Sequence, residues 1–184
     1  MIALYIVRHA ETDYNKQGRY LGRTDISLSS DGIHQAKELT MEVKGFPVDV
    51  VISSPLKRTM EMAHIIAPDK DIVKDDHFIE RSIGVYEGLT KQEAKNKYPD
   101  LYGRNITRIF NEAPPHGETI KQVQERVFEG INELKQKYQG KNILLVSHAF
   151  IAKVINKYFH PDLSDEDFFK FVLPLAGIAK YKIF

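Results

Sequence analysis

Residues 4–12 read Leu-Tyr-Ile-Val-Arg-His-Ala-Glu-Thr, an apolar run that ends abruptly in Arg8 and His9. The run from Ala3 to Val7 is too short for a typical helix and is rich in β-branched and aromatic residues, which predicts a buried strand. Ligands of open α/β sheets bind outside the carboxyl ends of the strands. An arginine beside a histidine at that place indicates an anion held next to a nucleophile or proton carrier. Two solvated polar residues that merely end a strand would give the same local pattern.

The composition of the whole chain narrows the class of protein. Its 184 residues suggest one domain, 1–184, with a sizeable core. Lys and Arg number 26 against 25 Asp and Glu, a balance that argues against nucleic acid or an anionic membrane as partner. The absence of cysteine excludes disulfides, thiolate metal sites and a cysteine nucleophile. No apolar stretch suits a signal peptide or a membrane span, so we expect a cytoplasmic protein; the sequence is silent on its oligomeric state.

Strand and helix patterns alternate along the chain. Good N-caps at Ser29, Ser54 and Ser164, and a capping box formed by Thr119 with Gln122, predict where helices begin. In the case of Ser54, Pro55 would occupy the first helical position. Further strands are predicted at 48–52, 72–73, 142–147 and 178–184. This order predicts a three-layer α/β/α sandwich with a mostly parallel central sheet, in which the lysine-bearing last strand lies near an edge.

The segment from about 75 to 117 is the least regular part of the chain. It contains Gly84, Gly88, Gly103 and the pair Pro114-Pro115, with short helices predicted around 91–97 and 105–111. We interpret this segment as a lid-like insertion of loops and helices that covers a site on the sheet.

Three predicted strand-to-helix junctions carry similar chemistry. Arg8 and His9 follow the first strand, Arg58 lies in the first turn of the helix after the second strand, and His148 follows the strand 142–147. If these strands are parallel, the junctions share one edge of the sheet, where helix N-termini also favour anions. The planar fork of arginine suits a tetrahedral oxyanion, and an unprotonated histidine nitrogen can attack phosphorus. The pattern therefore indicates a phosphate or sulfate site.

At this point the chain resembles the histidine phosphatase superfamily, also called the phosphoglycerate mutase-like family. The segment Leu4–Asn15 is similar to the family's Arg-His-Gly signature, with Ala10 in place of the usual glycine. The resemblance continues in order through nearly the whole chain, in the segments 17–25, 28–36, 53–59, 80–88, 117–119 and 146–149.

The resemblance implies a role for each matched residue. His9 would be the nucleophile that becomes phosphorylated, while Arg8, Arg58 and His148 would bind the phosphoryl group, assisted by Asn15. From the residues alone, Asn15 could equally stabilise a turn.

The resemblance also implies how the rest of the substrate is handled. The backbone of Leu21 and Gly22 would border it, and Glu80 would protonate the leaving oxygen and then activate water. A solvated carboxylate is the plainer interpretation of Glu80. No metal and no cofactor are expected, because the arginines supply the charge stabilisation that Mg²⁺ gives elsewhere.

Two reactions use such a site. Mutases of the family are longer, commonly carry a tyrosine where this chain has Ile83, and carry adjacent arginines where Arg104 and Arg108 are separated. We therefore favour a phosphomonoesterase that releases inorganic phosphate from small phosphorylated metabolites over a cofactor-dependent phosphoglycerate mutase. A catalytically inactive phosphate-binding module is a third possibility, against which the intact residue set argues. The substrate is left open among sugar phosphates, nucleotides, phosphoglycerates and a cobalamin precursor, and the roles of Lys91, Arg104 and Arg108 are left open as well.

Overall fold

The computed structural model describes residues 3–183, and within that range it contains one five-stranded sheet with the order β3-β2-β4-β1-β5. β1, β2, β3 and β4 run parallel. β5 lies at an edge of the sheet, as the lysine alternation predicted, and it pairs antiparallel to β1. Phe184, the last residue of the predicted final strand, lies outside the described residues. The strands are β1 Ala3–Arg8, β2 Val50–Ser53, β3 Ile72–Lys74, β4 Ile143–Ser147 and β5 Ile178–Lys182.

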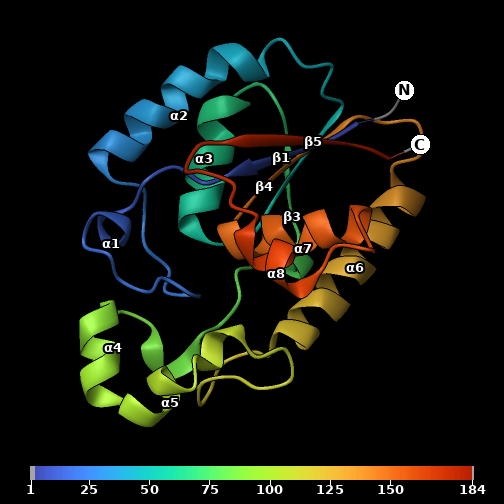
Figure 1. Cartoon of the computed structure of the whole chain (residues 1–184). Coiled ribbons are helices and arrows are strands. Elements are labelled where there is room, and N and C mark those ends of the chain that lie inside the picture. The colour runs from blue at the N-terminus through green and yellow to red at the C-terminus, as the bar shows by residue number, and fades with distance from the viewer. Residues whose placement is uncertain (1–2, 184) are drawn as a thin grey trace.

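Helices cover both faces of this sheet, which confirms the predicted three-layer α/β sandwich (Figure 1). Tyr5 and Val7 of β1 point into one core, with the helices α2 (Ser30–Val43) and α3 (Lys57–Ile66). Leu4 and Ile6 point into the other core. The helices on that second face are α6 (Ile120–Lys137), α7 (Ala149–Phe159) and α8 (Asp165–Lys170). Alternate side chains of β1 therefore pack against the helices on opposite faces of the sheet.

Three of the four predicted helix caps are confirmed. The side chains of Ser29, Thr119 and Ser164 each accept a hydrogen bond from the backbone three residues later. The prediction for Ser54 is wrong, because α3 begins at Lys57 and Leu56 is its N-cap. The backbone N–H of Ser54 still donates to Val146 in β4 at 3.0 Å, so the chain stays extended past the end of β2.

The segment between β3 and α6 is built from short elements. The helix predicted at 91–97 is present as α4, Lys91–Lys97, with Thr90 and Glu93 as its capping box. The helix predicted at 105–111 is wrong: α5 spans Pro99–Gly103, and only a 3₁₀ turn, η3, follows at Ile106–Arg108. Asn105 separates the two with a left-handed backbone (φ 53°), which a continuous helix cannot contain. The two remaining 3₁₀ turns are η1 Asp76–Phe78 and η2 Gly84–Tyr86.

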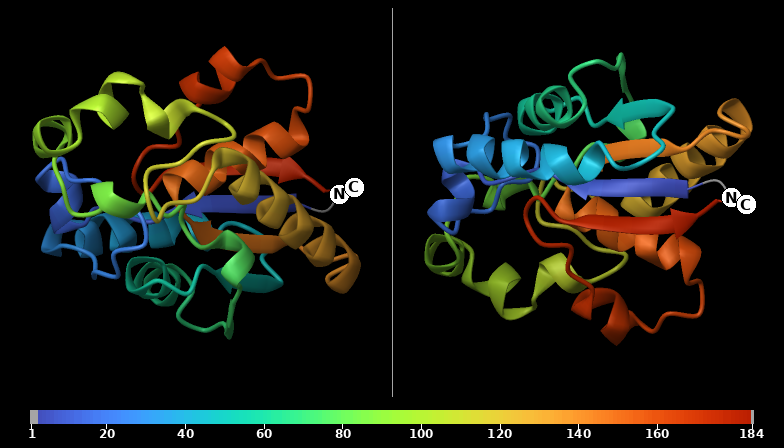
Figure 2. Two further views of the ribbon diagram at one scale, coloured as in Figure 1. Left: turned by 90° about the horizontal axis from the view of Figure 1, so that it is seen from below. Right: turned by 90° about the horizontal axis from the view of Figure 1, so that it is seen from above.

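The covering segment lies at the end of the molecule toward which β1 points (Figure 2). It has a small core of its own around Tyr86, Ala94 and Ile106. Beside it, the loop after β1 contains one short helix, α1, Asp13–Lys16. Together these segments surround the carboxyl ends of the parallel strands.

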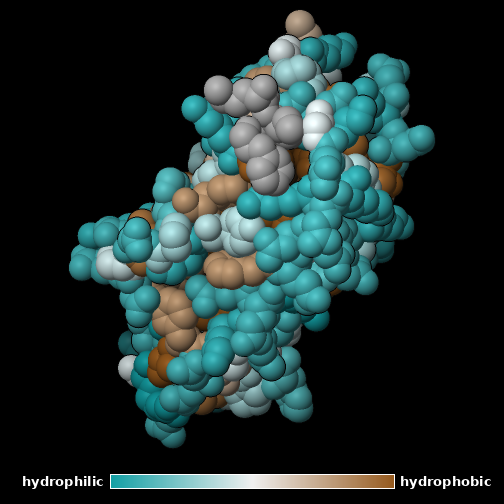
Figure 3. All heavy atoms as spheres, turned by 90° about the vertical axis from the view of Figure 1, so that its right-hand side faces the viewer, coloured by the Kyte–Doolittle hydropathy of each residue, from teal (hydrophilic) through white to brown (hydrophobic). Residues whose placement is uncertain are grey.

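The surface shows few apolar areas on the side that carries α6 and the chain ends. That face is mostly hydrophilic, with apolar side chains in small separate spots (Figure 3). No helix within residues 3–183 is long and apolar enough to cross a membrane.

Candidate active site

The sheet order brings the three junctions predicted from the sequence into one place. β4 lies between β1 and β2, with Arg8 in register with Ser147 and Ser53 in register with Val146. The residues that follow these strand ends are therefore neighbours. The rings of His9 and His148 meet edge to face, with their centroids 5.3 Å apart.

Hydrogen bonding fixes which nitrogen of His9 is free. Nδ1 of His9 lies 2.7 Å from the backbone oxygen of Ala10, so Nδ1 carries the proton and donates it. Burial and then the positive charge of Arg58 hold the pKa of His9 well below its usual value, against the opposing effect of the Ala10 bond. His9 is therefore a neutral imidazole whose Nε2 has an available lone pair, the state that nucleophilic attack requires.

Two arginines lie beside this histidine and are held in place by backbone oxygens. Arg58 is fully buried, and its Nη1 and Nη2 donate to Thr24 and Gly22, each at 2.8 Å. Nη1 of Arg8 donates to Leu173 at 2.8 Å. Burial lowers the pKa of Arg58 to about 10, and the nearby Glu80 opposes this effect, so both arginines stay positive at neutral pH.

Three buried nitrogens of this group have no hydrogen-bond partner among the described residues: Nε of Arg8, Nε of Arg58 and Nδ1 of His148, the last of which is a donor when the Ser54 hydroxyl donates to Nε2 of the same ring. Buried donors without partners are rare in folded proteins, and each calls for an explanation. Nε2 of His148 lies 2.7 Å from Oγ of Ser54, which fixes the ring. Donors of this kind beside two guanidinium groups suit the oxygens of a phosphoryl group.

Glu80 reaches the same site from the covering segment. Its Oε1 accepts a hydrogen bond from the backbone N–H of Arg81 at 2.9 Å. Burial of the carboxyl raises the pKa of Glu80, although the Arg81 N–H and the charge of Arg58 act in the opposite direction. A carboxyl with a raised pKa retains its proton at higher pH, which suits a general acid.

A pocket of about 430 Å³ opens beside these residues. Leu21 and Gly22, whose backbone was expected to border the substrate, line it together with Glu80 and Ile83. Aromatic side chains line it as well, among them Phe150, Phe169 and Phe171. The pocket therefore combines the Glu80 carboxyl with several apolar side chains that could contact the remainder of a ligand.

The structure separates the residues whose roles the sequence left open. Arg108 lines the pocket, with its guanidinium carbon 4.7 Å from the centre of the Phe169 ring, whereas Arg104 is paired with Glu112 on the surface. Lys91 lines a neighbouring hollow. Oδ1 of Asn15 accepts hydrogen bonds from the backbone and hydroxyl of Thr12, so the turn-stabilising role considered for Asn15 is present.

Sequence reasoning missed three contributors to the site. Ser54 was assigned to a helix cap and instead contacts His148. Arg81 is buried, donates to Glu118 and Thr107, and lies 5.0 Å from the centre of the Phe150 ring. Lys153 donates to the backbone oxygens that end α8. The adjacency of Arg81 to Glu80 was visible, but its burial and the position of Lys153 depend on long-range packing.

Comparison with known proteins gives the family. The model of the histidine phosphatase superfamily (branch 1) matches residues 4–183, and the chain belongs to this superfamily. An uncharacterized phosphatase, PhoE, of Bacillus subtilis is 38% identical over 81% of this chain and 72% of its own length. Phosphoserine phosphatase 1 of Hydrogenobacter thermophilus is 36% identical over the same shares.

This chain is also similar to a solved structure of a phosphatase. Phosphoserine phosphatase of Entamoeba histolytica, in complex with 3-phosphoglyceric acid, superposes with a TM-score of 0.85 at 28% identity, over 98% of this chain and 90% of that one. Mutases are similar as well: a 2,3-bisphosphoglycerate-dependent phosphoglycerate mutase of Lachnoclostridium phytofermentans is 28% identical over 98% of this chain and 86% of its own length. The family therefore contains both of the reactions considered from the sequence.

Proposed function

We propose that the protein is a metal-independent phosphomonoester hydrolase that acts on small phosphorylated metabolites through a phosphohistidine intermediate. The observation that carries this proposal is the neutral His9, whose Nδ1 proton is held by Ala10 while Arg8, Arg58 and His148 surround it. The phosphatase names of the most similar relatives support hydrolysis as the reaction.

In the first half-reaction, Nε2 of His9 attacks phosphorus and the bond from phosphorus to the leaving oxygen breaks. Glu80 gives its proton to that oxygen, which leaves as an alcohol. Arg8 and Arg58 stabilise the charge on the transferring group, and Nδ1 of His148 donates to one of its oxygens. Both guanidinium groups are fixed by backbone oxygens before substrate arrives, so little reorganisation is needed.

In the second half-reaction, water attacks the phosphohistidine and gives its proton to the Glu80 carboxylate. The bond between phosphorus and Nε2 breaks, inorganic phosphate leaves, and His9 and Glu80 regain their starting states. The segment 75–117 would act as a cover within a single domain, 1–184, because it brings Glu80 to the pocket.

The first testable prediction is that His9 carries the phosphoryl group and that no divalent metal is needed. Enzyme quenched during turnover in excess chelator is expected to contain acid-labile phosphate, which mass spectrometry maps to His9. His9→Ala is expected to lack both the phosphate and turnover. The control is His64→Ala, which removes a histidine on the exposed side of α3.

Phosphate found on another residue, or undiminished in His9→Ala, would contradict the assignment. Loss of turnover on chelation, with recovery on adding Zn²⁺ or Mg²⁺, would contradict the metal-free mechanism. Turnover without any trapped phosphoenzyme in His9→Ala would favour direct attack by water.

A further inference from the structure

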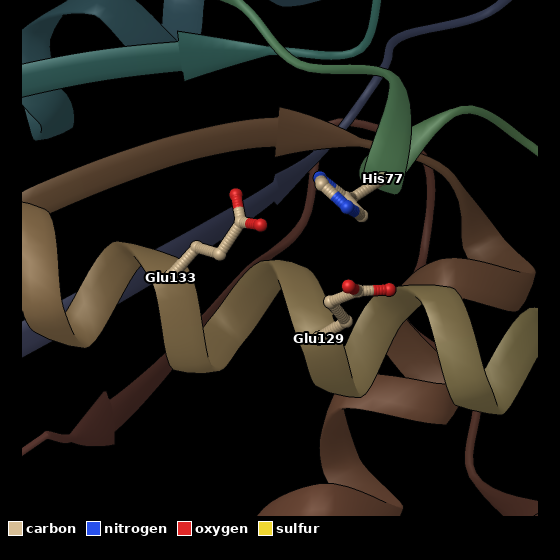
Figure 4. A group of neighbouring side chains, drawn as sticks. All are labelled: His77, Glu129 and Glu133. Carbon is tan, nitrogen blue, oxygen red and sulfur yellow. The ribbon is translucent and has the colours of Figure 1, made fainter.

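Three side chains outside the pocket converge between η1 and α6. His77 projects from η1, and Glu129 and Glu133 rise from the side of α6 that faces it (Figure 4). One ligand atom from each of the three lies within 4.8 Å of the others. None of them lines the pocket described above.

The orientation of His77 is set by a fourth residue. Nδ1 of His77 lies 2.9 Å from Oδ1 of Asp75, which leaves Nε2 as the nitrogen with a free lone pair. Histidines that bind metal ions almost always donate their other ring N–H to a carboxylate, a backbone oxygen or water, and that bond fixes the tautomer. Asp75 therefore gives His77 the outer partner that a metal ligand requires.

The two glutamates face His77 without a basic partner. Glu129 and Glu133 are exposed, lie four residues apart on one helix face, and form no ion pair with any residue in 3–183. Like charges at this spacing repel one another. The helix also comes close at this point, because a Cβ on Gly130 would lie 2.5 Å from Cβ of His77.

We propose that His77, Glu129 and Glu133 bind one divalent transition-metal ion of the Zn²⁺ type. One imidazole nitrogen with two carboxylate oxygens is a zinc ligand set, and solvent would complete the coordination. Ligand atoms around tetrahedral zinc lie roughly 3.3–3.5 Å apart. The exposed glutamate side chains would rotate toward His77 to shorten the present spacing when the ion binds.

The ion would connect α6 to η1, the segment of the chain that leads to Glu80. The backbone oxygen of His77 already accepts a bond from Nη1 of Arg126 in α6 at 2.7 Å, and that of Phe78 accepts one from Oγ of Ser147 at 2.8 Å. A metal ion adds a further connection between η1 and α6. Because the ion binds the folded state, it raises the melting temperature, and the rise grows with the logarithm of the free Zn²⁺ concentration once that concentration exceeds Kd.

Calorimetric titration of the chelator-treated full chain with Zn²⁺ tests the site. We expect one saturable site per chain and a melting temperature that rises with Zn²⁺. His77→Gln and the double variant Glu129→Gln/Glu133→Gln are expected to lower the affinity at least tenfold. Asp75→Asn, which keeps all three ligands, is expected to lower it by about 10- to 100-fold.

The control variant is His34→Gln. His34 is an exposed histidine that pairs with Glu38 at 3.6 Å on α2, so it tests whether any surface histidine beside a glutamate gives the same signal. Its affinity for Zn²⁺ is expected to be unchanged. Turnover of p-nitrophenyl phosphate reports that each variant is folded, because none of the substituted residues lines the pocket.

Absence of saturable Zn²⁺ binding to the unaltered chain would overturn the proposal. So would a site that survives His77→Gln, or one that is lost in His34→Gln. Zn²⁺ inhibition of turnover that persists in His77→Gln would place the ion in the catalytic pocket instead.

Discussion

His9 and Glu80 lie in one site, yet burial acts on them in opposite directions. It lowers the pKa of the imidazole and raises that of the carboxyl, so both groups favour their neutral forms. A neutral histidine is a nucleophile and a neutral carboxyl is an acid, which are the states that the proposed first half-reaction would use. Desolvation therefore favours the protonation state that each proposed role requires, a neutral imidazole for His9 and a neutral carboxyl for Glu80.

Glu80→Gln tests the acid role through the leaving group. General acid catalysis typically contributes about 10²- to 10⁴-fold to rate, and alkyl alcohols need the proton far more than p-nitrophenolate does. We expect a loss of that size for a sugar or serine phosphate and a much smaller one for p-nitrophenyl phosphate. Steady-state kinetics measure both, with Glu125→Gln on the exposed face of α6 as control. Equal losses for the two substrates would indicate a structural role.

The pH dependence gives an independent measure of the same carboxyl. Because its pKa is raised, Glu80 is protonated below that value and loses its proton as pH rises through it. For an alkyl phosphate, the ratio of kcat/KM between the unaltered enzyme and Glu80→Gln should be large at low pH and fall as pH rises. The ratio cancels the effect of the second ionisation of the substrate phosphate, which has a pKa of about 6. A ratio that does not change with pH would contradict the assignment.

Several residues of the candidate site could be predicted from the sequence, because they lie at the ends of short β-branched strands. Arg8, His9 and His148 are adjacent to such strands, and parallel pairing then determines their meeting. Residues whose roles depend on distant backbone atoms could not be predicted. Lys153 is an example, since its partners are carbonyl oxygens of α8.

The end of α8 shows how one helix shapes the apolar wall. Nζ of Lys153, in α7, donates to the backbone oxygens of Phe168, Phe169 and Phe171, the last at the C-cap of α8. Cations favour helix C-termini, where backbone oxygens lack partners. Burial, together with nearby Arg108, lowers the pKa of Lys153 to about 8, so the amine is mostly charged at neutral pH. Lys153 thereby holds two aromatic residues of the pocket.

Lys153→Met is expected to loosen this wall without touching the phosphoryl site. Loss of hydrogen bonds to a charged donor costs about 1.5–3 kcal/mol of stability. KM for bulky substrates should rise up to about tenfold, which corresponds to about 1.4 kcal/mol, with a smaller change in kcat. Kinetics with large and small phosphate esters measure the effect.

Lys157→Met is the matched control, because Lys157 lies one turn further along α7 and bonds the oxygens of Pro161 and Leu163, away from the pocket. It should lower stability while leaving KM unchanged. The same rise in KM in both variants would show that general destabilisation, rather than the wall, is responsible.

The wrong predictions fall on elements whose boundaries depend on tertiary contacts. Ser54 and Pro55 have the composition of a helix start, but pairing with β4 keeps the chain extended there. The segment 105–111 was predicted to be a helix, but the left-handed backbone of Asn105 interrupts it. The sheet and its layers were predictable because the hydrophobic periods and segment lengths typical of strands and helices repeat along the chain. The exceptions at Ser54 and Asn105 each depend on a local conformation that no repeated pattern indicates.

The shape of the whole pocket bears on which reaction would follow the proposed phosphorylation of His9. A mutase must hold the carboxylate of its substrate and keep water from the phosphohistidine until the phosphoryl group returns. In this chain Ile83 gives the pocket an apolar wall, and Arg108 lies against the Phe169 ring. Lys91 lies in the neighbouring hollow rather than in the pocket itself. At the rim, Val172 is 70% exposed.

An open, partly apolar pocket should admit water. Hydrolysis of the phosphohistidine is therefore expected to be faster than transfer of its phosphoryl group back to the substrate. With 3-phosphoglycerate as substrate and 2,3-bisphosphoglycerate present, inorganic phosphate should form faster than 2-phosphoglycerate. Phosphorus NMR measures both products in one sample, and His9→Ala, which should form neither, is the control. Isomer interconversion that exceeds phosphate release would mean that the covering segment closes over bound substrate, and the protein would then be a small cofactor-dependent mutase.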